Sequence, residues 1–131
     1  MSKEIKDLKI LIVDDDRFLL DMYALKFKKL GLQFDTSSSS TNALEILRKN
    51  NDYDIVLLDV IMPGIDGLEL LGKIREEKLV PNATIIMLTN QVDDSEKAKT
   101  LDVDGYLVKA MSIPSEVVDQ VLSIHNNKNK N

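Results

Sequence analysis

The amino-acid sequence predicts an α/β fold: one doubly wound parallel sheet with helices on both of its faces. Three short apolar runs, each four residues long and bounded by polar groups, occupy positions 10–13, 55–58 and 85–88. Such runs are typical of strands that are buried on both faces, as in a parallel sheet. Segments with helical spacing lie between the runs, and this alternation indicates right-handed βαβ units.

The composition indicates one ordinary globular domain. A chain of 131 residues with 44% hydrophobic residues can bury a single core. The net charge of −5 argues against broad nucleic-acid binding, which needs a basic face. The absence of cysteine and the single histidine, His125, exclude thiolate zinc sites, cysteine nucleophiles and multi-histidine metal sites. No apolar run approaches the roughly 20 residues of a membrane span, and no secretory signal is present, so we expect a cytoplasmic protein.

The strands follow from the apolar runs and from two shorter segments. The run around Phe34 is the weakest of them because it is the most polar. We expect strands at residues 9–14, 33–36, 54–59, 84–89 and 105–109.

The helices follow from apolar residues at three- and four-residue spacing. Gly31 is a stop signal after the first helix, Thr41 is a candidate cap of the second, and Pro114 opens the last. The fourth helix has only Ala98 and Leu101 as apolar anchors, so we expect it to be short and loosely held. We expect helices at residues 17–30, 41–49, 67–77, 94–101 and 114–125.

Other segments are expected to be simple connections. The four serines at 37–40 are interpreted as a loop, with a regulatory site as the alternative. Gly64 and Gly67 are interpreted as turn residues, and His125 as a solvated side chain. Residues 126–131 are expected to form a disordered tail or the start of a linker, so the domain is expected to span 8–125.

Polar residues stand at the carboxyl ends of the strong strands. In open parallel sheets, ligands bind outside these ends. The polar residues are Asp14-Asp15-Asp16 after the first strand, Asp59 after the third, Thr89 after the fourth and Lys109 after the fifth. We therefore expect these four groups to converge on one edge of the sheet.

This combination predicts phosphoryl chemistry. Carboxylates about 4–5 Å apart repel each other by roughly 3–4 kcal/mol per pair at an effective dielectric constant of 20, and one lysine cannot neutralise three of them. Mg²⁺ can, because it prefers oxygen ligands, whereas zinc and copper lack their usual donors here. Thr89 and Lys109 complete a cradle for phosphoryl oxygens, and aspartate can act as a phosphoryl-accepting nucleophile. The sequence therefore predicts phosphorylation of Asp59.

Four stretches carry a family resemblance: KILIVDDD at 9–16, LLDVIMPGIDG at 57–67, MLT at 87–89 and GYLVK at 105–109. From about residue 8 to 125, the chain resembles the receiver domain of bacterial response regulators (CheY-like) in two-component signalling. The most specific motif is Asp59-x-x-Met62-Pro63-x-x-x-Gly67 after a buried strand. The resemblance implies a flavodoxin-like (βα)5 sheet with strand order 2-1-3-4-5.

The resemblance also implies a role for each site residue. Asp59 would accept the phosphoryl group and ligate Mg²⁺ together with Asp15. Asp14 would act on the metal through a water molecule, and the backbone carbonyl of Ile61 would be a further ligand. The side chains of Thr89 and Lys109 would bind phosphoryl oxygens, and Tyr106 would reorient with Thr89 as the switch.

The partners implied by the resemblance are proteins. A sensor histidine kinase or a histidine phosphotransfer protein would supply the phosphoryl group. A downstream protein would bind the face built from the fourth helix, fifth strand and fifth helix, here residues 93–125. No direct contact with nucleic acid or membrane is expected. The chain would not be an enzyme with an external substrate, since it would catalyse only its own phosphotransfer and dephosphorylation.

The sequence departs from the family pattern at a few positions beside the site. Asn90 follows Thr89, where the family usually has alanine or glycine, and Ala110 follows Lys109, where proline is usual. Ile61 and Gln91 occupy variable positions that face the hydrolytic water in this family. Ile61 cannot orient that water.

Three alternative functions compete with this prediction. A receiver-like binding module that no longer switches is compatible with Asn90 and Ala110. An aspartate-nucleophile phosphatase of the haloacid-dehalogenase type fits only two positions of its motif, at Asp14 and Asp16, and the chain has no room for a cap. A flavodoxin is disfavoured because three aspartates would repel the flavin phosphate.

Overall fold

The computed structural model describes residues 4–60, 62, 64–89, 103–109 and 113–128. Within these residues, no helix has both the length and the apolar character needed to cross a membrane. The fourth helix expected at 94–101 lies outside them. In chain order the elements are η1 (Ile5–Asp7), β1 (Lys9–Val13), α1 (Arg17–Lys29), β2 (Gln33–Ser37), α2 (Ser40–Lys49), β3 (Ile55–Asp59), α3 (Gly67–Glu76), β4 (Thr84–Thr89), β5 (Gly105–Val108) and α5 (Pro114–Lys128).

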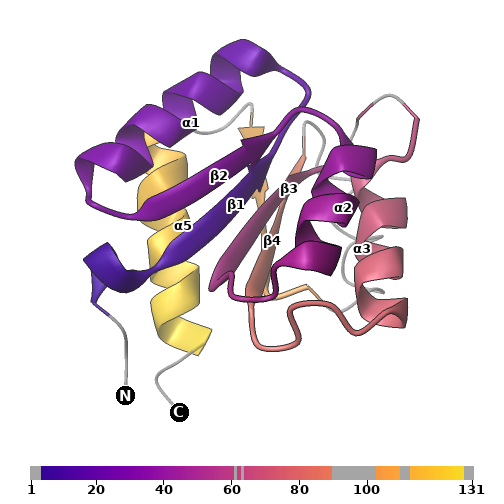
Figure 1. Cartoon of the computed structure of the whole chain (residues 1–131). Coiled ribbons are helices and arrows are strands. Elements are labelled where there is room, and N and C mark those ends of the chain that lie inside the picture. Colours follow the sequence, from indigo (N-terminus) through magenta and orange to yellow (C-terminus); the bar gives the residue numbers. More distant parts are fainter. Residues whose placement is uncertain (1–3, 61, 63, 90–102, 110–112, 129–131) are drawn as a thin grey trace.

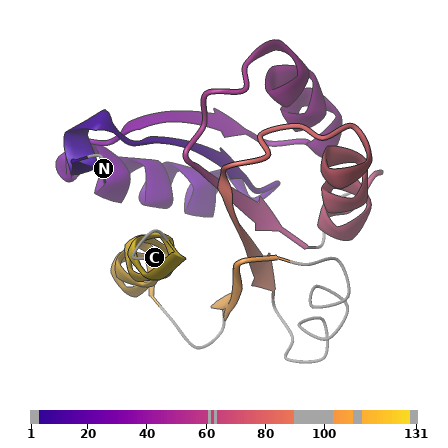
Figure 2. The ribbon, with the colours of Figure 1, turned by 90° about the horizontal axis from the view of Figure 1, so that it is seen from below.

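The five strands form one parallel sheet in the order β2-β1-β3-β4-β5. Helices α1 and α5 cover one face of this sheet, and α2 and α3 cover the other (Figures 1 and 2). The doubly wound fold and the strand order expected from the sequence are therefore confirmed. Each strand and each described helix lies within a few residues of its expected place.

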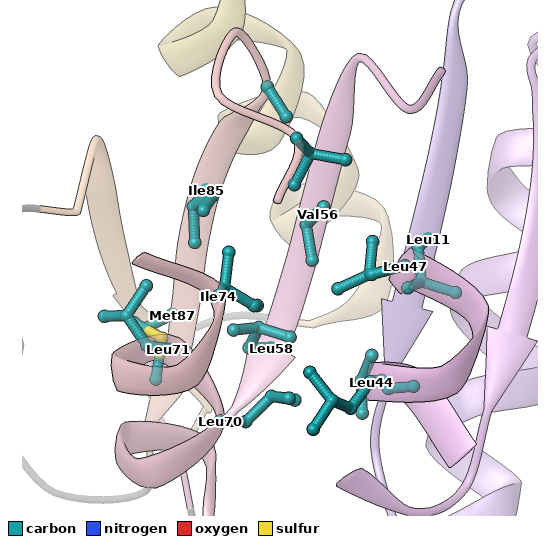
Figure 3. Packing of buried hydrophobic residues seen from close by; sticks show 14 of the residues in the cluster. Leu11, Leu44, Leu47, Val56, Leu58, Leu70, Leu71, Ile74, Ile85 and Met87 are labelled. Carbon is teal, nitrogen blue, oxygen red and sulfur yellow. The ribbon is translucent and has the colours of Figure 1, made fainter. Parts of the chain in front are cut away.

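The central strands β1, β3 and β4 are largely apolar because they are buried on both faces, whereas the edge strand β2 is mostly exposed and polar. Successive residues point to opposite faces, so each central strand supplies two cores. Figure 3 shows the core under α2 and α3, where Leu44, Leu47, Leu70, Leu71 and Ile74 meet Leu11, Val56, Leu58, Ile85 and Met87 of the strands. The alternate strand residues form the core under α1 and α5; they include Ile10, Ile12, Ile55, Leu57, Ile86 and Leu88.

Side-chain oxygens cap the helices that start at the carboxyl edge of the sheet. Asp16 accepts a hydrogen bond from the amide of Leu19 at 3.2 Å and so caps α1. Ser39 caps α2, because its Oγ accepts from the amide of Asn42 at 3.1 Å. The expected cap at Thr41 is therefore wrong by two residues. The serine tract is not a plain loop, since its first residue ends β2 and its last begins α2.

The end of α5 also differs from expectation. The helix continues to Lys128, so the tail expected from residue 126 is helical over 126–128. The Lys128 Nζ donates to the carbonyl of Ala83 at 2.8 Å and lies 3.2 Å from Asp104 Oδ2. His125 is half-buried, and its Nδ1 lies 2.7 Å from Thr84 Oγ1, so it is not merely solvated. These bonds to β4 and its neighbours hold the last turn in helical form.

Candidate functional site

The parallel registers bring the polar strand ends together. Asp14 follows one residue beyond the last β1–β3 pair, and Asp59 holds the same place on the neighbouring strand. Thr89 lies one residue beyond the β4 partner of Asp59. Lys109 follows directly after the β5 residue that pairs with Thr89. The sheet thus gathers the four side chains at its carboxyl edge.

The alternation of strand residues divides these side chains between the two faces. Asp14, Asp59 and Lys109 continue the rows that face α1 and α5. Thr89 continues the row that faces the other side, where Tyr106 packs against the core under α2 and α3. The charged groups therefore share one face, and the expected switch pair shares the opposite face.

Lys109 joins the two buried carboxylates. Its Nζ lies 2.8 Å from Asp14 Oδ2 and 3.2 Å from Asp59 Oδ2. The side chains are nearly removed from water, with exposed fractions of 10% for Lys109, 0% for Asp14 and 3% for Asp59. The other oxygen of Asp14 accepts from the amide of Asp16 at 2.9 Å. Asp14 is therefore tied both to the lysine and to the start of α1.

One positive charge does not balance this site. Burial, followed by the negative charge of Asp14, raises the pKa of Asp59 to about 7, although Lys109 acts in the opposite direction. Burial also lowers the pKa of Lys109. The hydrogen bond to Asp14 and the two carboxylate charges outweigh that effect, so the pKa of Lys109 is raised overall. The lysine is thus firmly protonated, and Asp59 is the group held away from its ordinary ionised state.

The donor set fits a divalent cation. One carboxylate oxygen each from Asp14, Asp15 and Asp59 lies within 4.8 Å of the others. The Asp59 Oδ1 atom is buried and has no hydrogen-bond partner in the part of the chain that the structure describes. Asp15 is exposed, so the cluster is open to solvent on its side. An all-oxygen set of this kind is the environment that Mg²⁺ prefers. Ile61, the expected carbonyl ligand, lies outside the described residues.

Gly67 contributes to the site in a way that sequence reasoning missed. A Cβ on this residue would lie 2.0 Å from the carbonyl oxygen of Asp59, so only glycine fits at this approach. Its amide donates to the carbonyl of Val60 at 2.8 Å. Gly64 has a φ of 77° and is the turn glycine of the same loop. The sequence motif contains Gly67, but it does not reveal that the absence of a side chain there allows the close approach to the Asp59 carbonyl.

Tyr23 is a second residue that the sequence did not single out. It is buried on α1, in the core under α1 and α5. Burial raises its pKa; Lys109 lowers it, and Asp14 and Asp59 raise it further. The phenol therefore lies in the electric field of the charged groups. Its only sequence signal was an aromatic residue at helical spacing, which is typical of ordinary core.

Comparisons with known proteins agree with this geometry. The model of the response regulator receiver domain family matches residues 10–121. The chain is 34% identical over 118 residues to the transcriptional regulatory protein ResD of Bacillus subtilis, covering 88% of this chain and 47% of ResD. It is 32% identical over 109 residues to the response regulator SaeR of Staphylococcus aureus, covering 83% of this chain and 46% of SaeR. The chain spans about half the length of both relatives.

Solved structures show the same likeness. The response regulator TrrA of Thermotoga maritima, in complex with Mg²⁺ and BeF, superposes with a TM-score of 0.77 at 32% identity, covering 90% of this chain and 99% of that one. A receiver domain from Francisella superposes with a TM-score of 0.81 at 25% identity, covering 94% of this chain and 100% of that one. The family model matches most of the chain, and the relatives are more than 30% identical to it. This chain therefore belongs to the response regulator receiver domains of two-component signalling.

Proposed function

We propose that this receiver domain accepts a phosphoryl group on Asp59 in a Mg²⁺-dependent reaction. The observation that carries the proposal is the state of the Asp59 carboxyl group. One of its oxygens contacts Lys109 at 3.2 Å, and the other is buried without a hydrogen-bond partner among the described residues. Asp14 and Asp15 lie beside it with oxygens in position for a shared cation.

The chain's own groups supply most of the chemistry. An Asp59 oxygen forms the bond to phosphorus while the donor's bond to its leaving nitrogen or oxygen breaks. Lys109 and the Thr89 hydroxyl are proposed to bind the phosphoryl oxygens, where charge-assisted hydrogen bonds are strongest. Asp15 and Asp59 would ligate Mg²⁺ directly and Asp14 through a water molecule, with the carbonyl of Ile61 as a further proposed ligand. The bound cation would neutralise charge on the phosphoryl oxygens.

The reaction acts on the protein itself. The phosphoryl group moves from the donor to Asp59 and later to water, and no external substrate is converted. We therefore propose self-catalysed phosphotransfer and dephosphorylation, without the status of an enzyme that turns over a separate substrate.

The proposed donor is a sensor histidine kinase or a histidine phosphotransfer protein. Two large apolar side chains favour a protein at this edge: Phe18, in the first turn of α1, is 73% exposed, and Ile113, directly before α5, is 60% exposed. Helices α1 and α5 pack against each other, so both residues flank the face that carries the charged groups. We place this exchange in the cytoplasm.

The proposed output is a protein-interaction face at residues 93–125. Thr89 and Tyr106 lie in rows that face the same side of the sheet, which supports their coupling. Part of this face lies outside the described residues. We propose that the domain itself binds protein and not nucleic acid, because its net charge is −5. Longer relatives such as ResD are named as transcriptional regulators.

No observation favours the alternatives. A dehalogenase-type phosphatase would need Asp16 as a second catalytic carboxylate, but the Asp16 side chain caps α1. Nothing in the comparisons indicates a module that has lost its switch.

The proposal is tested by intact-protein mass spectrometry after incubation with acetyl phosphate. The wild-type chain should gain one phosphate in the presence of Mg²⁺ and none in the presence of EDTA. Asp59→Asn should gain none, whereas Asp21→Asn, which changes an exposed aspartate on α1, should behave as the wild type. Phosphate uptake by Asp59→Asn at the wild-type rate would show that the acceptor is another residue.

A further inference from the structure

We propose that Ser40 is a positioning residue for the loop that carries the phosphoacceptor Asp59. The inference rests on the proposed function of Asp59 and adds a residue that acts at a distance from it. Ser40 is the first residue of α2 and is 1% exposed. Its Oγ donates a hydrogen bond to the backbone carbonyl of Ile65, which lies 25 positions further along, in the loop between β3 and α3.

That loop is built directly onto the backbone of the acceptor residue. Asp66, the next residue after Ile65, caps α3 through the amide of Glu69 at 2.9 Å. Gly67 then donates to the carbonyl of Val60 at 2.8 Å and packs against the Asp59 carbonyl. Ile65 therefore directly precedes the Asp66-Gly67 pair that supports Asp59, and a displacement of Ile65 is passed along the chain to that contact. Ser40 ties this loop to the capped start of α2.

The hydroxyls of Ser37 and Ser39 form no hydrogen bond with the described residues of the loop between β3 and α3. Ser37 Oγ donates to the carbonyl of Ser39 at 2.7 Å and lies 2.9 Å from the side-chain oxygen of Asn42. Ser39 Oγ caps α2 by accepting from the Asn42 amide. Both hydroxyls bond within residues 37–42, whereas the Ser40 hydroxyl reaches a separate loop. The tract thus contains a natural control for the proposal.

Removing the hydroxyl of the buried Ser40 would leave the Ile65 carbonyl without this donor. The loop would then occupy a wider range of positions, and the Asp59 carboxyl group would spend less time aligned with Asp14 and Lys109. A single neutral hydrogen bond corresponds to about a fivefold change in such an equilibrium. We expect phosphate uptake from acetyl phosphate to slow by about that factor in Ser40→Ala.

The test compares Ser40→Ala with Ser39→Ala. Both variants lose one serine hydroxyl at the start of α2, so both should unfold at a lower temperature. Two quantities are measured: the initial rate of phosphate uptake, by intact mass, and hydrogen exchange at the Gly67 amide without any phosphodonor. Only Ser40→Ala should slow uptake and speed exchange at Gly67. If Ser40→Ala does not fold, Ser40→Cys, which fills the same space but donates only a weak hydrogen bond, takes its place.

Two results would overturn the inference. One is equal phosphate uptake in the Ser40→Ala and Ser39→Ala chains. The other is Gly67 exchange that Ser40→Ala leaves unchanged. Failure of the proposed function would look different, because the wild-type chain would then take up no phosphate on Asp59. The exchange measurement needs no phosphorylation, so it tests the role of Ser40 in either case.

Discussion

The Cα of Gly67 lies against the backbone carbonyl of Asp59, so closely that a Cβ would come within 2.0 Å of the carbonyl oxygen and 2.9 Å of its carbon. The first turn of α3 is thereby stacked on the end of β3, with no side chain between them. This contact holds the backbone of Asp59, the proposed acceptor, against the start of α3.

Gly67→Ala should therefore destabilise the fold and displace the site. The obstacle is backbone and cannot rotate away, so we expect a loss of about 2–4 kcal/mol in the free energy of unfolding and slower phosphate uptake. Gly72→Ala is the matched control on the same helix, where a Cβ would meet nothing within 4 Å. That change should stabilise the fold by about 0.5–1 kcal/mol in urea denaturation. Equal stabilities for the two variants would contradict the contact.

The positive charge of Lys109 offsets the repulsion between the buried carboxylates of Asp14 and Asp59. Replacing this lysine with alanine leaves Asp14 and Asp59 facing each other in a nearly dry site. We expect a loss of about 3–5 kcal/mol in metal-free buffer, partly restored by millimolar Mg²⁺, which supplies the missing positive charge. Lys73→Ala, at an exposed position on α3, should change stability by less than about 0.5 kcal/mol. A Lys109→Ala loss that Mg²⁺ leaves unaltered would argue against charge as its cause.

The raised pKa of Asp59 predicts a definite pH dependence. The folded chain binds this proton more tightly than the unfolded chain does, because the pKa rises from 3.8 to about 7 on folding. The stability contributed by the proton is therefore complete below pH 3.8 and is lost as the pH rises through about 7. Asp59→Asn, which stays neutral, should gain about 1–3 kcal/mol over the wild type at about pH 8 in EDTA.

That gain should shrink to nearly zero at about pH 4, where the wild-type carboxyl group is also neutral. Chemical denaturation at the two pH values measures both differences. A destabilised Asp59→Asn at the higher pH would mean that the Lys109 ion pair outweighs the repulsion from Asp14.

Mg²⁺ should stabilise the wild-type fold through the same carboxylates. At ten times its dissociation constant, the gain by linkage is about 1.4 kcal/mol, which a thermal scan detects. Asp15 is exposed, so Asp15→Asn should leave metal-free stability nearly unchanged while removing most of the gain. Asp21→Asn should retain the full gain. A melting temperature that is independent of Mg²⁺ in the wild type would count against the metal site.

The switch is tested through Thr89. Under the proposed function, phosphate on Asp59 would offer new oxygens to the Thr89 hydroxyl, and a ligand shifts an equilibrium only through such differential contacts. Thr89→Ala should still accept phosphate but respond less to it. Hydrogen exchange over residues 90–110, with and without beryllofluoride, should show a change in protection that is larger in the wild type than in the variant. Identical protection in both states of the wild type would leave phosphorylation without a conformational response.

The sequence alone determined the order and type of the five strands and of the described helices α1, α2, α3 and α5, together with the polar residues at the strand ends. The strands could be recognised because a parallel sheet covered on both faces needs continuous apolar segments such as 55–58. Asp14, Asp59, Thr89 and Lys109 could be grouped from their positions in the chain, since parallel strands deliver their carboxyl ends to one edge. Helix boundaries were predicted less accurately from the sequence, because the cap at Ser39 and the extension of α5 to Lys128 depend on hydrogen bonds to particular partners.

Only the tertiary structure decided which groups meet, and at what distance. It placed Lys109 on both carboxylates, Gly67 on the Asp59 carbonyl, Ser40 on the loop before α3 and His125 on Thr84. Each pair joins residues from different parts of the chain, and the local sequence around one residue does not predict its partner. Periodicity and composition predict which residues of a segment are buried and which are exposed. A contact between two side chains far apart in the chain depends on how the helices pack on the sheet, and that packing exists only in the folded molecule.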